Sequence, residues 1–164
     1  MKQIFLLRHA KSDWNNLSQQ DFDRPLAKRG IEDANLLSQY IKEKRYLISR
    51  VFCSSAERAK QTFDICSDGF NFKIENATYL EDLYFGECDQ IINLIQCQAE
   101  SLSSILIVGH NPTLHLLLEK LTKKTIKKFS TCSLAEINIE NSWKDLSLKK
   151  CKLKSFIKPR ELKS

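Results

Sequence analysis

The sequence lacks any long apolar run. No segment of its 164 residues approaches the roughly 18 consecutive apolar residues of a membrane-spanning helix. The N-terminal apolar run, residues 4–7, is too short for the hydrophobic region of a secretory signal peptide. We therefore predict no membrane association, and the cytoplasm is the expected location.

Cysteine patterns typical of metal sites and disulfide frameworks are also missing. No two cysteines form a C-x-x-C pair, and none stands at metal-site spacing from a histidine. Most lie in apolar segments, so we expect reduced core residues and predict neither a metal nor a cofactor. The six are Cys53, Cys66, Cys88, Cys97, Cys132 and Cys151.

Internal repeats, low-complexity tracts and interdomain linkers are absent as well. The apolar fraction of 42% and the charged fraction of 28% are ordinary for a globular protein. A chain of this length predicts a single domain, residues 1–164, and a monomer is the default expectation.

The net charge of +6 comes mostly from lysines late in the chain. No aromatic residues interleave with them as stacking platforms for nucleic acid would require. We interpret these lysines as solvated faces and a basic C-terminal hairpin, so no nucleic-acid partner is predicted, although an acidic protein partner would also suit a basic chain. They are Lys120, Lys123, Lys124, Lys127, Lys128, Lys144, Lys149, Lys150, Lys152 and Lys154.

One arrangement occurs three times: an apolar strand candidate, a turn, and a helix start that carries an arginine or a histidine. Residues 3–7 lead into Arg8 and His9, residues 50–53 lead toward Arg58, and residues 104–108 lead into His110. Ligands of open α/β sheets bind outside the carboxyl ends of the strands. These four side chains are therefore expected to converge there on a doubly charged anion.

Helical periodicity predicts an amphipathic helix over residues 27–44, with Gly30 as a weak point. A capping-box pattern at Ser54 and Glu57 predicts a helix over residues 55–66, which Asp68-Gly69 would end and which places Arg58 in its first turn. Helix dipoles favour anions at such a position.

The remaining elements follow from shorter patterns. Residues 72–74 are a candidate strand, and Asp89 is the expected cap of a helix running toward residue 99. Asn111 would cap the next helix with Pro112 in its first position. Residues 134–140 and 146–157, joined through Asn141-Ser142, suggest an antiparallel pair at a sheet edge.

Taken together, these blocks resemble the histidine phosphatase superfamily, and within it the short phosphohistidine phosphatases of the SixA type. Arg8-His9-Ala10 is similar to the family's Arg-His-Gly signature, and Ser12, Trp14 and Asn15 are similar to the positions after it. Later blocks match in order, at residues 23–26 with 29–30, 54–62, 108–112 and 156–162.

The resemblance implies a three-layer α/β/α fold of the phosphoglycerate mutase type, with a mostly parallel sheet and no large cap. It also implies a metal-independent phosphatase in which His9 is the nucleophile, Arg8 and Arg58 bind phosphate, and His110 is the second histidine of the pocket. Ala10 departs from the family glycine. If that glycine permits positive φ, alanine would be strained by about 1–2 kcal/mol; if it only clears space, a methyl group is tolerated.

Several site residues stay open. Asn15 and Arg24 are candidate phosphate ligands, but Arg24 is as well suited to pair with Asp21 or Asp23. Glu81 resembles the general acid of larger relatives, and Asp82 is its rival.

Two further polar residues have structural alternatives. His115, on the leucine-rich helix, is interpreted as structural. Ser133 either lines the pocket or starts a strand.

The chemistry requires His9 to be neutral, and two nearby guanidinium groups would lower its pKa. A backbone carbonyl is the simplest acceptor to fix its tautomer, and His110 would donate to the equatorial oxygens. Three functions compete: a phosphohistidine phosphatase acting on a phosphorylated protein, a phosphatase or mutase for small phosphate esters, and a non-catalytic phosphate-binding module.

Overall fold

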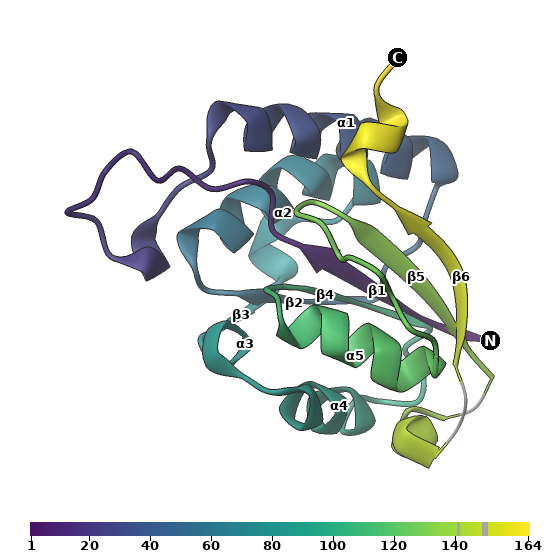
Figure 1. Ribbon diagram of the computed structural model, residues 1–164. Coiled ribbons are helices and arrows are strands. Elements are labelled where there is room, and N and C mark those ends of the chain that lie inside the picture. The colour runs from purple at the N-terminus through teal and green to yellow at the C-terminus, as the bar shows by residue number, and fades with distance from the viewer. Residues whose placement is uncertain (141, 149–150) are drawn as a thin grey trace.

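A six-stranded sheet forms the centre of the computed structural model, which describes residues 1–140, 142–148 and 151–164 (Figure 1). The strand order is β3-β2-β4-β1-β5-β6, with β3, β2, β4 and β1 parallel and β5 antiparallel to both β1 and β6. The predicted class, a mostly parallel sheet with an antiparallel edge, is confirmed. The strands are β1 (Lys2–Arg8), β2 (Arg50–Ser54), β3 (Thr78–Leu80), β4 (Ser104–Gly109), β5 (Leu134–Ile139) and β6 (Lys152–Ile157).

Helices cover both faces of this sheet. One face carries α1 (Lys28–Lys44) and α2 (Glu57–Phe70), and the other carries α4 (Cys88–Gln96) and α5 (Thr113–Thr122), with the short α3 (Asp82–Phe85) near β3 (Figure 1). Within β1, Phe5 and Leu7 pack in the core under α1 and α2, whereas Ile4 and Leu6 pack in the opposite core. A strand buried on both faces has no polar face, which explains its uninterrupted apolar run.

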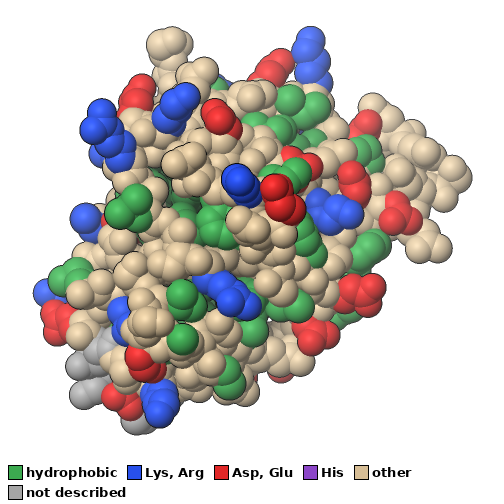
Figure 2. Space-filling view, turned by 180° about the vertical axis from the view of Figure 1, so that it is seen from behind, with side chains coloured by type: hydrophobic (Ala, Val, Ile, Leu, Met, Phe, Trp, Pro, Cys, Tyr) green, Lys and Arg blue, Asp and Glu red, His purple; other side chains and the backbone are tan. Residues whose placement is uncertain are grey.

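The register brings the strand ends to one edge. Leu7 of β1 pairs with Val108 of β4, which pairs in turn with Cys53 of β2. Arg8 and His9 therefore leave the sheet beside His110. Residues 9–27 form a long loop that stands out from the body of the molecule at the left of Figure 1 and the right of Figure 2.

Helix α1 follows the prediction closely, but Gly30 has a different role from the one expected. A Cβ atom at Gly30 would lie 2.1 Å from the carbonyl oxygen of Lys11. The same oxygen accepts a hydrogen bond from the backbone N–H of Ala27 at 2.9 Å. Glycine is thus required because the backbone of the loop after β1 packs directly against the helix here. Gly30 is a close backbone contact and not a weak point of the helix.

Helix α2 differs from its prediction at both ends. It begins at Glu57 and ends at Phe70, and no capping box forms, since Ser54 is the last residue of β2 and the N-cap is Ala56. Gly69 does not end the helix but lies inside it. Glycine is needed there because a Cβ atom would lie 2.3 Å from the carbonyl oxygen of Ser38. The helix ends at Asn71, whose φ of 52° is left-handed.

The prediction of a strand at residues 72–74 is wrong. This stretch enters a 3-10 turn, Ile74–Asn76, and the edge strand is β3, which pairs with residues 52–54 of β2. Phe72 instead packs at the margin of the core under α1 and α2. Its apolar character reflects that packing and not strand pairing.

Two predicted helix caps are also wrong. Helix α4 is capped by Glu87, two residues before Asp89, in a capping box with Gln90, and it ends at Gln96. Helix α5 starts at Thr113 after Pro112, and Asn111 does not cap it. The Asn111 side-chain amide donates instead to the carbonyl of Phe129 at 2.8 Å. Tertiary partners outcompete the local caps at these positions.

The antiparallel pair near the C-terminus is confirmed as β5 and β6, but the second strand is shorter than expected. A 3-10 segment, Trp143–Leu148, occupies the beginning of the range predicted as strand. Trp143 is fully buried and its indole N–H donates to the carbonyl of Leu102 at 3.0 Å. Asn141, Lys149 and Lys150, which the sequence placed in the turn and the basic hairpin, lie outside the described residues.

Candidate active site

His9 is the first residue after β1, and its ring is fixed by a neighbouring backbone carbonyl. Nδ1 lies 2.7 Å from the carbonyl oxygen of Ala10, and only 7% of the residue is exposed. A carbonyl can only accept, so Nδ1 carries the proton and the lone pair of the neutral ring is on Nε2. The expectation that a backbone carbonyl fixes this tautomer is confirmed.

Ala10 holds that carbonyl in place without backbone strain. Its φ is not positive, so the first explanation for a glycine at this position does not apply here. Its N–H donates to Oγ1 of Thr62 at 2.9 Å, and the Thr62 hydroxyl donates to the carbonyl of Arg58 at 2.7 Å. Thr62 therefore ties the His9 loop to the first turns of α2.

His110 leaves the end of β4 and faces His9. The two ring centroids are 5.1 Å apart, and Nε2 of His110 lies 2.8 Å from Oγ of Ser54, the last residue of β2. Oγ of Ser54 also accepts the N–H of Ala56 at 3.2 Å. Nδ1 of His110 is buried and has no hydrogen-bond partner among the described residues.

Two arginines flank the histidines. Arg58, the second residue of α2, is 6% exposed and donates to the Asp21 carbonyl at 2.7 Å and carboxylate at 3.0 Å. Arg8 donates to the carbonyl of Phe129 at 3.0 Å. Burial, together with the charge of Arg58, lowers the pKa of Arg8. Nε of each arginine is buried without a partner in the described chain.

Asp21 and Tyr84 join this cluster although the sequence did not single them out for the site. The Asp21 carboxylate accepts from Arg24 at 2.8 Å, from Arg58 and from the Tyr84 hydroxyl. Partial burial raises its pKa, but the hydrogen bonds from Tyr84 and Arg24 and the charge of Arg58 prevail and lower it to about 2. The Tyr84 ring lies edge-on to His110 at 5.3 Å.

The balance of charge in this cluster is positive. Three guanidinium groups, those of Arg8, Arg24 and Arg58, are offset by the single carboxylate of Asp21, which leaves +2 (3 − 1) when both histidines are neutral. Buried charges of the same sign repel one another, and an anion bound among them offsets that repulsion. A net charge of +2 matches a phosphoryl dianion.

Both histidines are neutral at pH 7. Burial is the main cause that lowers the pKa of His9 to about 3; the Ala10 hydrogen bond opposes it, and the charges of His110, Arg58 and Arg8 add to it. Burial, then the charge of Arg58, lowers the pKa of His110 to about 4. The direction predicted for His9 is confirmed, but the arginines are the lesser cause because the ring has lost its water.

These shifts predict an acid sensitivity of the fold. Below about pH 6.5 the unfolded chain binds protons at both histidines and the folded chain does not. The free energy of unfolding therefore decreases as the pH is lowered. The expected loss is about 1.4 kcal/mol per pH unit for each histidine, down to about pH 4. Urea unfolding at several pH values measures it. A His9→Asn/His110→Asn variant serves as the comparison, and an equally steep decline in that variant would refute the assignment.

The alternatives for the second group of predicted ligands resolve differently. Arg24 is 6% exposed and pairs with Asp21; it also donates to the Ser12 hydroxyl at 2.6 Å, and its guanidinium stacks 3.4 Å from the centre of the Trp14 ring. Asn15 is exposed in the loop, where its N–H donates to Asp13. The structure therefore brings Arg24 to the cluster through Asp21 and does not bring Asn15 there.

The candidates for a general acid are both exposed. Glu81 lies between β3 and α3, and Asp82 is the first residue of α3. Ser133 is buried, its backbone carbonyl accepts the N–H of Arg8 at 3.2 Å, and its hydroxyl has no partner among the described residues. The structural role predicted for His115 is supported by its hydrogen bond to the Ile126 carbonyl at 2.8 Å.

The six cysteines form no disulfide, and in the described part of the chain no three His, Cys, Asp or Glu side chains are grouped as a metal site. None of the helices described here is long and apolar enough to span a membrane.

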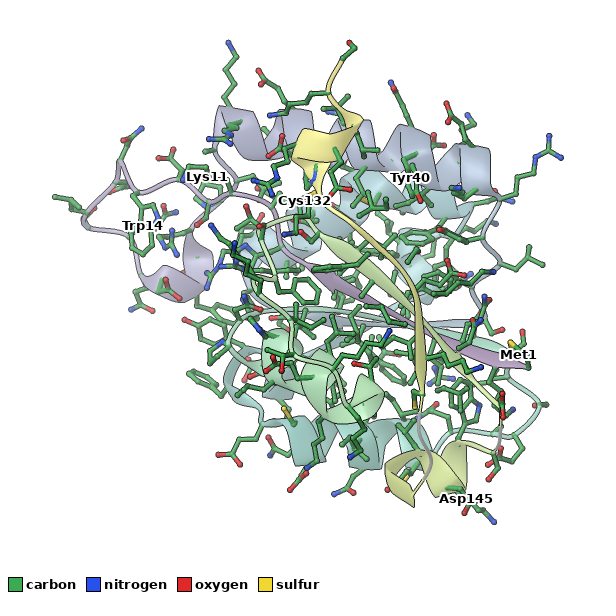
Figure 3. All side chains as sticks on the ribbon, turned by 45° about the vertical axis from the view of Figure 1, so that its right-hand side comes forward. Met1, Lys11, Trp14, Tyr40, Cys132 and Asp145 are labelled. Atoms are coloured by element: carbon green, nitrogen blue, oxygen red, sulfur yellow. The ribbon has the colours of Figure 1, made fainter. Side chains whose placement is uncertain are left out.

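The residues that sequence reasoning missed act through tertiary contacts. Ser54 and Thr62 belong to the block that resembled the family, so their positions were visible but their partners were not. Cys132 precedes β5 and its N–H donates to the carbonyls of Arg8 and His9. Lys11, Trp14 and Cys132 lie at the same end of the sheet, away from Met1 (Figure 3). No sequence signal pointed to Tyr84.

Comparison with known proteins gives a consistent result. A family model described as the histidine phosphatase superfamily, branch 1, matches residues 4–96. An uncharacterized protein of Mycobacterium leprae is 30% identical over 94% of this chain and all of its own length. The phosphohistidine phosphatase SixA of Escherichia coli is 26% identical over 85% of this chain and 87% of its own. A structure of the protein histidine phosphatase SixA complexed with tungstate superposes with a TM-score of 0.85 at 24% identity, covering 98% of this chain and 99% of that one.

Proposed function

Because this chain belongs to the histidine phosphatase superfamily, we propose that it is a phosphohistidine phosphatase that acts on a phosphorylated protein through a covalent phospho-His9 intermediate. The observation that carries the proposal is the state of His9. Its ring is neutral, its Nδ1–H is held by the Ala10 carbonyl, which leaves the lone pair on Nε2, and the ring lies 5.1 Å from that of His110 within a cluster of net charge +2. This is the arrangement that a nucleophile for a phosphoryl dianion requires.

The first step transfers the phosphoryl group. Nε2 of His9 forms a bond to phosphorus as the phosphorus–nitrogen bond of the donor breaks, and the electron pair of that bond stays on the donor imidazole, which takes up a proton from solvent water. Charge spreads over the three equatorial oxygens in a loose transition state. Arg8, Arg58 and Nδ1 of His110 have the buried donors to stabilise these oxygens.

Ser54 is suited to set the tautomer of His110 for this task. Its Oγ accepts the N–H of Ala56 with one lone pair and lies 2.8 Å from Nε2 of His110, and in the proposed state its hydroxyl proton is donated to that nitrogen. His110 would carry its own proton on Nδ1 and donate to phosphate while remaining neutral. In the second step water attacks phosphorus, the bond to His9 breaks, and inorganic phosphate leaves. The guanidinium groups supply the positive charge, so the proposed mechanism requires no metal.

A phosphohistidine is preferred over a phosphate ester because of the leaving group. An alkoxide must be protonated as it departs, whereas the imidazole nitrogen of phosphohistidine leaves readily. Glu81 and Asp82, the candidates for a general acid, are exposed. SixA of Escherichia coli, a relative that aligns with 85% of the chain, is named for the same activity, which supports this choice.

A substrate panel tests the proposal. Purified wild-type protein should release phosphate from phosphohistidine proteins, and Glu81→Gln should retain that rate within about threefold, since the step needs no strong acid. If small phosphate esters are the true substrates, Glu81→Gln should instead lower their hydrolysis by about 100-fold or more.

Asp82→Asn tests the rival acid in the same way, and Glu75→Gln, which removes an exposed carboxylate from the 3-10 turn before β3, is the matched control. Efficient ester hydrolysis that collapses in Glu81→Gln would favour the small-ester function. Binding of phosphate without turnover of any substrate would favour the non-catalytic one.

A further inference from the structure

We infer that a basic cleft beside the histidine site binds an acidic segment of the protein that presents the phosphoryl group. This inference rests on the proposed function and adds a recognition surface to it. The cleft has a volume of about 300 Å³, and neither histidine lines it. Arg8 belongs both to the cleft and to the histidine site. We call it the basic cleft.

Four segments build the basic cleft. They are the end of β1 with the loop after it, the start of α1, the loop before β5, and residues 158–163, which consist of the C-terminal 3-10 segment Pro159–Leu162 and its two flanking lysines. That last segment packs beside α1 (Figure 1). Of the 11 residues that line the basic cleft, 7 are lysines or arginines. The four segments contribute Lys11, Arg29, Lys128, Lys158 and Arg160 among them.

The charge of the basic cleft is not neutralised by the protein itself. Its one carboxylate belongs to Asp33, which is 5% exposed and pairs with Lys163 at 3.3 Å. The other six cations have no ion pair with any residue that the structure describes. Concentrated unpaired charge of one sign in a concave surface attracts ligands of the opposite sign.

The position of the basic cleft relates it to the reaction site. Leu7 of β1 pairs with Leu134 of β5, and Leu134 pairs with Ile157 of β6, so the three strand ends lie in a row. The histidines lie over β1 and β4, and the cleft lies over β1, β5 and β6. A protein whose phosphohistidine reaches His9 would therefore lay neighbouring residues along the cleft.

The lining favours carboxylates of a protein over other anions. None of its residues is aromatic, so it offers no stacking platform for nucleic-acid bases. Lysines from separate segments are flexible point charges that adapt to carboxylates at varied spacings. Charge complementarity of this kind raises association rates and selects partners.

The experiment compares two synthetic phosphohistidine peptides of equal length, one with glutamates and one with glutamines around the phosphohistidine. At low salt, wild-type protein should turn over the glutamate peptide with a kcat/KM about tenfold higher, mainly through KM. The variant K128Q/K158Q/R160Q should lose this preference and keep the wild-type rate on the glutamine peptide. The variant K42Q/K73Q/K124Q removes the same charge from exposed lysines outside the cleft and should keep the preference.

Equal turnover of the two peptides by wild-type protein, or an undiminished preference in the cleft variant, would overturn the inference. Binding of both peptides to His9→Ala protein, measured by fluorescence anisotropy, separates this result from failure of the proposed function. If no phosphohistidine peptide is hydrolysed, the function is wrong. The inference then stands only if the glutamate peptide still binds more tightly and the cleft substitutions abolish the difference.

Discussion

Replacing His9 with alanine is expected to lower kcat/KM on a phosphohistidine substrate by about 10⁴-fold or more. The nucleophile is lost, and the remaining arginines can bind phosphate but cannot form the covalent intermediate. Wild-type protein mixed rapidly with substrate should carry an acid-labile phosphoryl group on His9, and the variant should carry none. Rapid quenching at alkaline pH followed by mass spectrometry of the peptides measures both.

His115 provides the matched control for this experiment. It is one of only three histidines in the chain, and its ring is held by the Ile126 carbonyl away from the cluster. His115→Gln should keep wild-type turnover and the phosphoryl label. The nucleophile assignment would be wrong if His9→Ala retained turnover within tenfold of wild type, or if the label were found on another residue.

Replacing Arg58 with alanine is expected to lower kcat/KM by about 10³-fold. The substitution reduces the charge of the cluster from +2 to +1 and removes a buried guanidinium whose Nε faces no protein acceptor. Inhibition by inorganic phosphate should weaken in parallel, because the same contact binds the product. Steady-state kinetics with and without added phosphate measures both effects.

Two further variants make the Arg58 result specific. Arg58→Lys keeps the charge but loses the planar fork, so it should recover only part of the activity. Arg50→Ala removes an exposed arginine from the opposite end of the preceding strand and should leave kinetics unchanged. An Arg58→Ala protein that is folded yet within threefold of wild type would contradict a role at the phosphoryl group.

Asp21 explains how so much positive charge is kept in place. It accepts from Arg24, Arg58 and Tyr84, so one carboxylate orients two guanidinium groups and a phenol at the mouth of the site. It neutralises only one of three positive charges, which leaves the dianion a favourable partner. Because hydrogen bonds and nearby cations hold its pKa near 2, this carboxylate stays ionised across the physiological range.

Much of this site was predictable because it depends on where parallel strands end. Residues 3–7 and 104–108 are apolar on both faces, which predicts central strands, and central parallel strands bring their carboxyl ends together. His9 and His110 then lie close together because β1 and β4 are neighbours in the sheet, a pairing that the structure shows. Their assigned roles in catalysis remain proposals that the variants above test.

Local signals failed where a residue had a better partner far away in the chain. The sequence pattern predicts Ser54 as a helix cap, but Ser54 ends β2 and forms a hydrogen bond with His110. The pattern also predicts Asn111 as a cap, but its side-chain amide donates to the carbonyl of Phe129. Gly30 reads as a weak point, but it admits the backbone of Lys11. In each case the competing contact spans a chain separation that no short window contains.

The amino-acid sequence by itself determined the class of sheet, its central strands and the four cationic or imidazole residues expected near the strand ends, because hydrophobic periodicity is a local property and parallel strands end at one edge of a sheet. Only the tertiary structure decided the rest: that Asp21 and Tyr84 complete the cluster, that Thr62 fixes the loop of His9, and that burial more than charge keeps both histidines neutral. Desolvation and long-range hydrogen bonds depend on which surfaces meet, and the chain settles that only when it folds.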